Sequence, residues 1–264
     1  MKRIHLFEFE DFPWFPDWIR RLMTRYIVAV HRLLGTAPEL AGLVKKALPY
    51  SPVPHIIDLC SGSGGPMPEV VAHLQAGGDH ADLSLSLTDL YPNLEVAQEV
   101  NTDAHPHISY QTEPVNAAAL DPTIKGLRTM VCSMHHMRPE VAKSILRDAQ
   151  QARQPICVFE ISDNSFVKWL WWIAIPINII VVLLVTPMIR PMTWQQLVFT
   201  YLIPILPLVI AWDGSVSNAR TYTLADMDIL LEGLDSADYT WEKGTIKGKA
   251  KKLYLMGLPV PKPA

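Results

Sequence analysis

One apolar segment, which ends in an acid and a glycine-rich turn, most limits what this chain can fold into. It reads His55-Ile56-Ile57-Asp58-Leu59-Cys60-Ser61-Gly62-Ser63-Gly64-Gly65-Pro66. A helix-like stretch, residues 67–74, follows the turn. A strand, a glycine turn and a helix in this order form nucleotide-cofactor sites at the carboxyl edge of a parallel sheet, where the helix N-terminus presents free N–H groups. The segment therefore predicts a nucleotide-like cofactor.

The polar residues that follow the first three expected strands indicate which cofactor. Asp58 would repel a pyrophosphate but suits a cationic amino group. A second strand-like run, residues 84–88, ends at Asp89, whose carboxylate can accept both hydroxyls of a ribose. A third run, residues 108–111, precedes Asn116, whose amide can bind the edge of an adenine. An amino-acid group, a ribose and an adenine in this order describe S-adenosylmethionine.

These motifs resemble those of the class I S-adenosylmethionine-dependent methyltransferases, over residues 37–165 and again from near residue 220. The resemblance implies an α/β fold with a Rossmann-like seven-stranded sheet, helices on both faces and N-terminal helices before it. Two positions depart from the family pattern. Cys60 replaces the usual first glycine, which indicates a slightly different turn, and Asn116 replaces the usual acid but still allows an adenine contact.

The resemblance also implies which residues bind the cofactor, all of them in loops that follow strands. They are Asp58, Cys60, Ser61, Gly62, Ser63, Gly64, Asp89, Leu90, Asn116, Ala117 and Ser133. The alternative is a Rossmann-like domain that binds another cofactor or has a degenerate site. Because a degenerate site has no reason to retain both Asp58 and Asp89, we favour the functional site.

The net charge and the spacing of the cysteines limit the kinds of partner and ligand that the chain can bind. The 264 residues carry a formal net charge of −3, and no stretch interleaves basic and aromatic residues, so no nucleic-acid partner is expected. The three cysteines, Cys60, Cys132 and Cys157, lack the CxxC spacing of zinc sites and of redox motifs. We expect them to be core residues in a reducing cytosol, and we expect no metal ligand. The acidic N-terminal residues are not expected to form a signal peptide.

Strand-like and helix-like segments alternate through most of the chain, which predicts a parallel sheet covered on both faces. The expected strands are residues 55–59, 83–88, a run near 108, 129–133 and 156–161, and a closing hairpin is formed by residues 239–246 and 251–258. Helices are expected over residues 14–34, 39–48, 69–75, 93–101, 139–152 and 224–234.

An insertion between the fifth strand and the last helix is unusually apolar. No charged residue occurs in residues 169–189 or 191–212, on either side of Arg190. Each run has the roughly 20 residues needed to cross a hydrocarbon core of about 30 Å, and aromatic residues gather toward the ends. Four prolines, at positions 176, 187, 204 and 207, interrupt the runs.

Three arrangements remain open for this hairpin: a membrane-spanning pair, a re-entrant or interfacial pair, or a buried pair that forms a lid or a dimer contact. We favour membrane embedding on hydropathy grounds, with the catalytic domain facing the cytoplasm. The expected domains are a helical lid over residues 1–54, a cofactor-binding domain over 55–165 and 213–264, and the hydrophobic insertion over 166–212. The oligomeric state is left open.

Four residues are candidates for the chemistry. His135 and His136 follow the fourth strand, where one of them could act as general base; the alternative is a loop histidine bonded to backbone. Asp213 and Tyr222 follow the apolar insertion and could orient an acceptor, as could Arg220.

The sequence therefore predicts methyl transfer to a lipophilic small molecule, such as a quinone, an isoprenoid, a polyketide or a lipid, at or near a lipid bilayer. Two alternatives are retained. One is a soluble homodimeric methyltransferase whose hairpin forms the dimer or a substrate lid, and the other is a non-catalytic Rossmann-like membrane scaffold.

Overall fold

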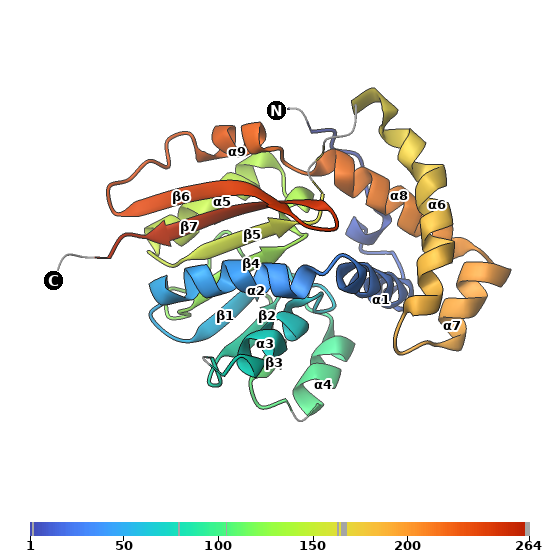
Figure 1. Cartoon of the computed structure of the whole chain (residues 1–264), viewed down its shortest axis with the longest axis horizontal. Coiled ribbons are helices and arrows are strands. Elements are labelled where there is room, and N and C mark those ends of the chain that lie inside the picture. The colour runs from blue at the N-terminus through green and yellow to red at the C-terminus, as the bar shows by residue number, and fades with distance from the viewer. Residues whose placement is uncertain (2, 79, 104, 163, 165–167, 262–264) are drawn as a thin grey trace.

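A seven-stranded sheet forms the centre of the protein (Figure 1). The computed structural model describes residues 1–261 except residues 2, 79, 104, 163 and 165–167. The strands are β1 (His55–Leu59), β2 (Ser84–Thr88), β3 (Ile108–Tyr110), β4 (Leu127–Val131), β5 (Ile156–Glu160), β6 (Tyr239–Lys247) and β7 (Lys251–Pro259). Their order is β3-β2-β1-β4-β5-β7-β6, with β1 to β5 parallel and β7 antiparallel to both of its neighbours. The predicted Rossmann-like sheet with its closing hairpin is confirmed.

The sheet is buried on both faces, and apolar residues of its central strands supply most of the two cores. In β5, Cys157 and Phe159 pack into one hydrophobic cluster, while Ile156 and Val158 pack into the other. All four side chains are fully buried. Successive side chains of a strand point to opposite faces, so a continuous apolar run supplies two cores at once.

Helices cover the two faces separately. The first core is covered by α2 (Thr36–Ala47), α3 (Met67–Ala76) and α4 (Leu94–Thr102). The second is covered by α5 (Pro139–Gln151) and α9 (Leu224–Leu231). The capping box between Thr223 and Asp226 is present at the start of α9. β4 begins and ends two residues earlier than expected, so Cys132 and Ser133 belong to the turn that leaves the strand.

A helical lobe lies beside the sheet, and β5 points toward it (Figure 1). It consists of α1 (Asp17–Leu33), η4 (Lys168–Ile173), α6 (Ala174–Val185), η5 (Thr186–Met188), α7 (Trp194–Leu197), η6 (Val198–Leu202) and α8 (Ile205–Arg220). A third hydrophobic cluster holds α1, α6 and α8 together, with Met23, Val182 and Leu206 among its fully or almost fully buried members. Short 3-10 turns complete the fold: η1 (Phe9–Asp11), η2 (Leu48–Tyr50) and η3 (Met134–His136).

The second half of the predicted hairpin is not one helix. α7 and the π-helical turn η6 are bent by 83° from α8, at Ile203 and Pro204. A proline inside a helix removes a backbone donor and clashes with the preceding turn, which accounts for the break. α8 runs from the insertion to Arg220, so the expected boundary between residues 212 and 213 falls within one helix. The boundary at 165 and 166 lies outside the described residues.

Alanine substitutions at two glycines should change the stability of the protein in opposite directions. Gly126 has φ +154° and a Cβ there would lie 2.6 Å from the carbonyl oxygen of His55, whereas a Cβ at Gly42, inside α2, would meet nothing within 4 Å. We expect Gly126→Ala to lower the free energy of unfolding by about 2 kcal/mol or more. Gly42→Ala should raise it by about 0.5–1 kcal/mol, because alanine loses less backbone entropy in a helix. Urea denaturation measures both, and equal shifts for the two variants would contradict the described strand contact.

Candidate functional site

The glycine turn after β1 is tied to the ends of the two neighbouring strands. The backbone N–H of Gly62 donates to Asp89 Oδ2 at 2.9 Å, and the Tyr110 hydroxyl donates to the Gly62 carbonyl at 2.7 Å. Gly62, Gly64 and Gly65 all have positive φ, and a Cβ at Gly62 would meet nothing within 4 Å. The turn is thus held open, with backbone that a ligand can approach closely.

Two cysteines at strand ends adopt the left-handed conformation that usually belongs to glycine. Cys60 has φ +58° after β1, and Cys132 has φ +52° after β4. Such residues cost roughly 1–3 kcal/mol each and gather at functional sites. Cys60 therefore keeps the backbone conformation that the usual glycine would adopt easily. Burial raises the pKa of both thiols, that of Cys60 to about 12, so neither is a thiolate at neutral pH.

Asp58 lies beneath the glycine turn. Thr129 Oγ1 donates to its Oδ1 at 2.6 Å and Ser61 Oγ to its Oδ2 at 2.8 Å. Burial raises the pKa of Asp58 to about 7, although these two hydrogen bonds oppose the shift. Its side chain is therefore partly protonated near neutral pH, and a cationic group placed against it would favour the charged form.

The remaining predicted cofactor residues surround the same edge of the sheet. Asp89 also accepts the Tyr91 N–H through Oδ1, and its carbonyl accepts the Val115 N–H at 2.8 Å, which holds the loop after β3 beside it. Asn116 is exposed and its Oδ1 accepts the N–H of Ala118. Ser133 is buried, and its Oγ has no hydrogen-bond partner among the described residues. Ala117 is buried, Leu90 and Gly62 are exposed, Gly64 is buried, and Ser63 is partly buried.

These observations fit a cofactor with an amino-acid group, a ribose and an adenine. The open backbone at Gly62 leaves room for a ligand. Ser133 Oγ, which has no partner among the described residues, is available to bind one, since buried polar atoms are usually paired. The assignment of individual residues to parts of the cofactor stays a prediction.

His135 has the geometry of a general base. Its Nδ1 lies 2.8 Å from Glu160 Oε2, and its backbone N–H donates to Glu160 Oε1 at 3.1 Å. Both side chains are buried. A carboxylate at Nδ1 fixes the proton there and leaves Nε2 as the proton acceptor. Sequence reasoning missed Glu160, although it ends an apolar strand as Asp58 and Asp89 nearly do.

His136 is placed differently. Its Nδ1 lies 2.9 Å from Asp11, and its Nε2 lies 3.8 Å from Glu8 and 3.7 Å from Glu10. Burial lowers the pKa of His136, but the hydrogen bond with Asp11 and the charges of the three acids outweigh it and raise the pKa to about 9. A histidine that is protonated at neutral pH fits an ion-pair partner better than the base expected from sequence.

Asp213 and Tyr222 hold backbone in place. The Asp213 carboxylate accepts the Phe9 N–H at 2.8 Å and the Glu10 N–H at 3.3 Å, and burial raises its pKa to about 8. The Tyr222 hydroxyl donates to the Met137 carbonyl at 2.7 Å and accepts from Arg3 at 2.6 Å. Both anchor neighbouring segments, and their contact with an acceptor stays a prediction.

The N-terminal segment, residues 3–12, lies within the expected lid and contacts the two histidines, but its acidic residues were not expected to contact them. Arg220 of α8 donates to Glu8 Oε1 at 2.9 Å and to Asp11 Oδ2 at 2.6 Å, and Ser217 Oγ donates to Glu8 Oε2 at 3.0 Å. Acidic and aromatic residues alternate in this segment, and such alternation predicts an extended segment with one polar side and one apolar side.

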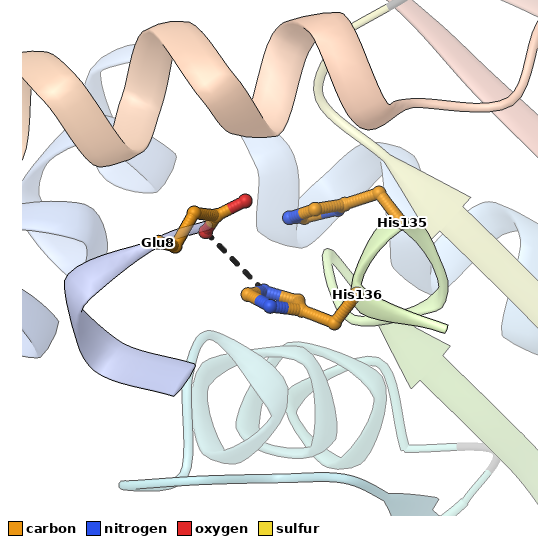
Figure 2. A group of neighbouring side chains, drawn as sticks. All are labelled: Glu8, His135 and His136. Atoms are coloured by element: carbon orange, nitrogen blue, oxygen red, sulfur yellow. Dashed lines mark ion pairs between the residues drawn. The ribbon is translucent and has the colours of Figure 1, made fainter. Parts of the chain in front are cut away.

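Glu8, His135 and His136 each turn one ligand atom toward the others, and these atoms lie within 4.8 Å of one another. Figure 2 shows both imidazole rings, which leave the turn after β4, projecting toward Glu8 of the N-terminal segment. Arg220 already compensates Glu8, and Asp11 already binds His136. We therefore describe the group as an ionic network, and the expectation that the chain has no metal ligand stays a prediction.

No family model matches the chain, and no curated protein matches it. Solved structures do match. The plantazolicin methyltransferase BpumL, in complex with a monoazolic desmethylPZN analog and SAH, has a TM-score of 0.52 and 10% identity, over 93% of this chain and 98% of that one. An O-methyltransferase family 2 protein from Planctomyces limnophilus DSM 3776, in complex with apigenin, has a TM-score of 0.51 and 14% identity, over 92% of this chain and 61% of that one.

An O-methyltransferase from neocarzinostatin biosynthesis, NcsB1, in complex with S-adenosylmethionine and 2-hydroxy-5-methyl naphthoic acid, has a TM-score of 0.47 and 12% identity. At that TM-score the likeness carries no argument. The match covers 85% of this chain and 57% of that one, so this chain spans less than two thirds of the length of two of the three proteins. At these identities the comparisons show the fold, which is that of the class I methyltransferases.

The raised pKa of Asp58 predicts a specific pH dependence of stability. Between its ordinary pKa of 3.8 and its folded pKa of about 7, the folded state holds a proton that the unfolded state has lost. Stability should therefore fall as pH rises from 4 to 7, on the order of 1 kcal/mol per unit of pKa difference. Asp58→Asn should remove this loss and make the protein more stable than the wild type at pH 8.

Denaturation in urea at several pH values measures the difference between wild type and variant. The control is Asp82→Asn, because Asp82 is exposed before β2 and its replacement should leave the pH dependence unchanged. A difference between wild type and Asp58→Asn that does not vary with pH would contradict the buried position of this carboxyl.

Proposed function

We propose that this chain transfers the methyl group of S-adenosylmethionine to a lipophilic small molecule at or near a membrane, with its sheet domain in the cytoplasm. The proposal starts from the class I methyltransferase fold. The single observation that carries it is the hydrogen bond between Gly62 and Asp89, because it joins an open glycine turn to the acid of the next strand. The two residues then face one ligand from two loops.

S-adenosylmethionine supplies a methyl group on a positively charged sulfur, which is already activated for transfer. Asp89 would hold the ribose, Asp58 would compensate the amino group from beneath the turn, and Asn116 would lie beside the adenine. Ser133, in the turn after β4, brings to the same edge a hydroxyl that has no partner in the described part of the chain. The protein must then align an acceptor, exclude water and remove one proton.

The proton is assigned to His135. Glu160 holds Nδ1, so Nε2 can take the proton of an acceptor hydroxyl while the carboxylate stabilises the imidazolium that forms. The N-terminal segment lies over this position and keeps water out, since its backbone is bonded to Asp213 and its acids to Arg220.

The helical lobe beside the site supports a lipophilic acceptor. The large apolar side chains exposed on α6, α7, η6 and α8 form an uncharged surface next to the carboxyl edge of the sheet. A lipophilic molecule bound there would approach the methyl group without crossing water. The apigenin bound to the Planctomyces protein is a phenolic acceptor-like molecule of this kind, which supports testing phenols and quinols first.

Cofactor binding tests the core of the proposal. Isothermal titration of S-adenosylmethionine into wild-type protein should show micromolar affinity, and Asp89→Ala should weaken it about 100-fold, because two hydrogen bonds to a ribose are lost together with the tie to Gly62. The matched control is Asp82→Ala, which replaces an exposed acid outside the glycine turn. Absence of binding by a folded wild-type sample would contradict methyl transfer and favour the scaffold alternative.

Replacement of His135 tests the base. With radiolabelled cofactor and a panel of lipophilic phenols and quinols, His135→Asn should lower kcat about 100-fold or more and leave cofactor affinity unchanged. Glu160→Gln should lower kcat less and alter the dependence of kcat on pH, because it positions His135 without touching the acceptor. His73→Asn, an exposed histidine on α3, should have no effect. Full activity of His135→Asn would exclude it as the base.

A further inference from the structure

An exposed apolar face runs along the helical lobe. On α6 and η5 the exposed residues recur with helical spacing, which places them on one side of the helix. They are Ile177, Ile180, Val181, Leu184 and Met188. The face continues on α7, η6 and the start of α8, where the exposed residues are Trp194, Leu197, Tyr201, Leu202, Ile203, Ile205 and Leu208. Leu184 is 70% exposed and Leu202 is 75% exposed, which is unusual for leucine in a protein surrounded by water.

Residues 170–188 are long and apolar enough to cross a membrane, with a mean hydropathy of 2.2 and only 17% of the window buried. The first half of this stretch is nevertheless held beside the polar network of the site. Asn178 Nδ2 donates to Ser215 Oγ at 2.9 Å. Ser215 lies in α8 between Asp213 and Ser217, which bind the backbone of Phe9 and the carboxylate of Glu8.

Only the part of the stretch beyond Asn178 is therefore free to enter a bilayer. Residues 179–188 rise about 15 Å along a helix axis, whereas a bilayer core is about 30 Å thick. Placing the whole of residues 170–188 in hydrocarbon would carry Arg220 and its acidic partners Glu8 and Asp11 in with them, and charged groups at bilayer depth are costly. The free part of the stretch is therefore too short to cross a bilayer.

The second half of the hairpin is also too short and too strongly bent to span a bilayer. α7 and η6 together cover only residues 194–202, and the 83° bend then turns the chain into α8. The tip carries Arg190, which is exposed and donates to the carbonyls of Pro187 and Ile189. A charge at the bilayer centre costs about 2.5–3.5 kcal/mol or more, so this tip belongs in the headgroup layer.

We propose that the hairpin lies in the plane of one leaflet, with its exposed apolar face in the acyl chains and Arg190 among the headgroups. The inference rests on the membrane association in the proposed function and replaces a spanning hairpin by an interfacial one. Phe7 of the N-terminal segment contacts Trp212 of α8, with 5.1 Å between ring centroids, so the cover of the site is packed against the helical lobe. A lipophilic acceptor could then move from the leaflet to the site.

Binding to vesicles tests the inserted face. Vesicles of phosphatidylcholine and phosphatidylglycerol in equal amounts are mixed with the protein and separated by flotation. Ile180→Glu should weaken binding by about tenfold or more, because it places a charge in the acyl region. The matched control is Ile229→Glu, which is also exposed and lies on α9, a helix outside the lobe that covers one face of the sheet (Figure 1). Equal loss for both variants would overturn the assignment of this face.

The depth of labelled residues in the bilayer distinguishes a hairpin that lies in one leaflet from a hairpin that spans the membrane. Single cysteines at Leu184 and Arg190 are labelled with a nitrobenzoxadiazole dye, with the parent protein as background for Cys60 and Cys132, and the protein is added to preformed vesicles. External dithionite, which does not cross bilayers, should reduce the dye in Arg190→Cys and spare the dye in Leu184→Cys. Lipids brominated on the acyl chains should quench the dye in Leu184→Cys.

The other outcomes overturn the inference in distinguishable ways. Protection of the dye in Arg190→Cys until the vesicles are permeabilised would show a spanning hairpin and leave membrane association standing. No flotation of folded wild-type protein would remove the membrane from the proposed function as well. A stable dimer in size-exclusion chromatography, lost in Ile180→Glu, would assign the face to a second copy. Titration with S-adenosylmethionine reports on methyl transfer independently of all three.

Discussion

The buried guanidinium of Arg220 joins the three parts of this protein. It donates from Nε to the Leu6 carbonyl at 2.7 Å, and from its two terminal nitrogens to Glu8 and Asp11. An ion pair out of water is unfavourable unless its remaining donors are satisfied, and here each donating nitrogen has a partner. Because Arg220 ends α8, these bonds hold the N-terminal segment against the helical lobe, and the hydrogen bond between Asp11 and His136 adds the turn after β4.

That junction explains why the molecule has polar chemistry next to an uncharged surface. Toward the sheet, α8 carries Asp213, Ser217 and Arg220, which hold the cover of the site. Toward its N-terminus, the same helix carries Leu206, Val209 and Ile210, which pack with α1 and α6. One helix thus changes from apolar to polar along its length.

Sequence patterns located the sheet closely because its strands are locally distinct. The apolar runs of β1, β2 and β5 and the closing hairpin of β6 and β7 lie where expected, with shifts of one or two residues. The turn of Gly62 and the acid Asp89 also lie at the carboxyl edge of the sheet, as the motifs predict, while their contacts with a cofactor stay a prediction. The contacts of the acids in the N-terminal segment could not be predicted in this way, since Glu8 and His136 are neighbours only in the folded chain.

By itself, the sequence determined the alternating fold, the glycine turn with its acids and the uncharged character of the insertion, because each depends on residues within one turn or one strand. Only the tertiary structure decided that His135 is backed by Glu160, that His136 is enclosed by acids, and that Asn178 is bonded to Ser215. Side-chain contacts between distant segments depend on how helices pack on the sheet edge, and periodicity carries no information about that packing.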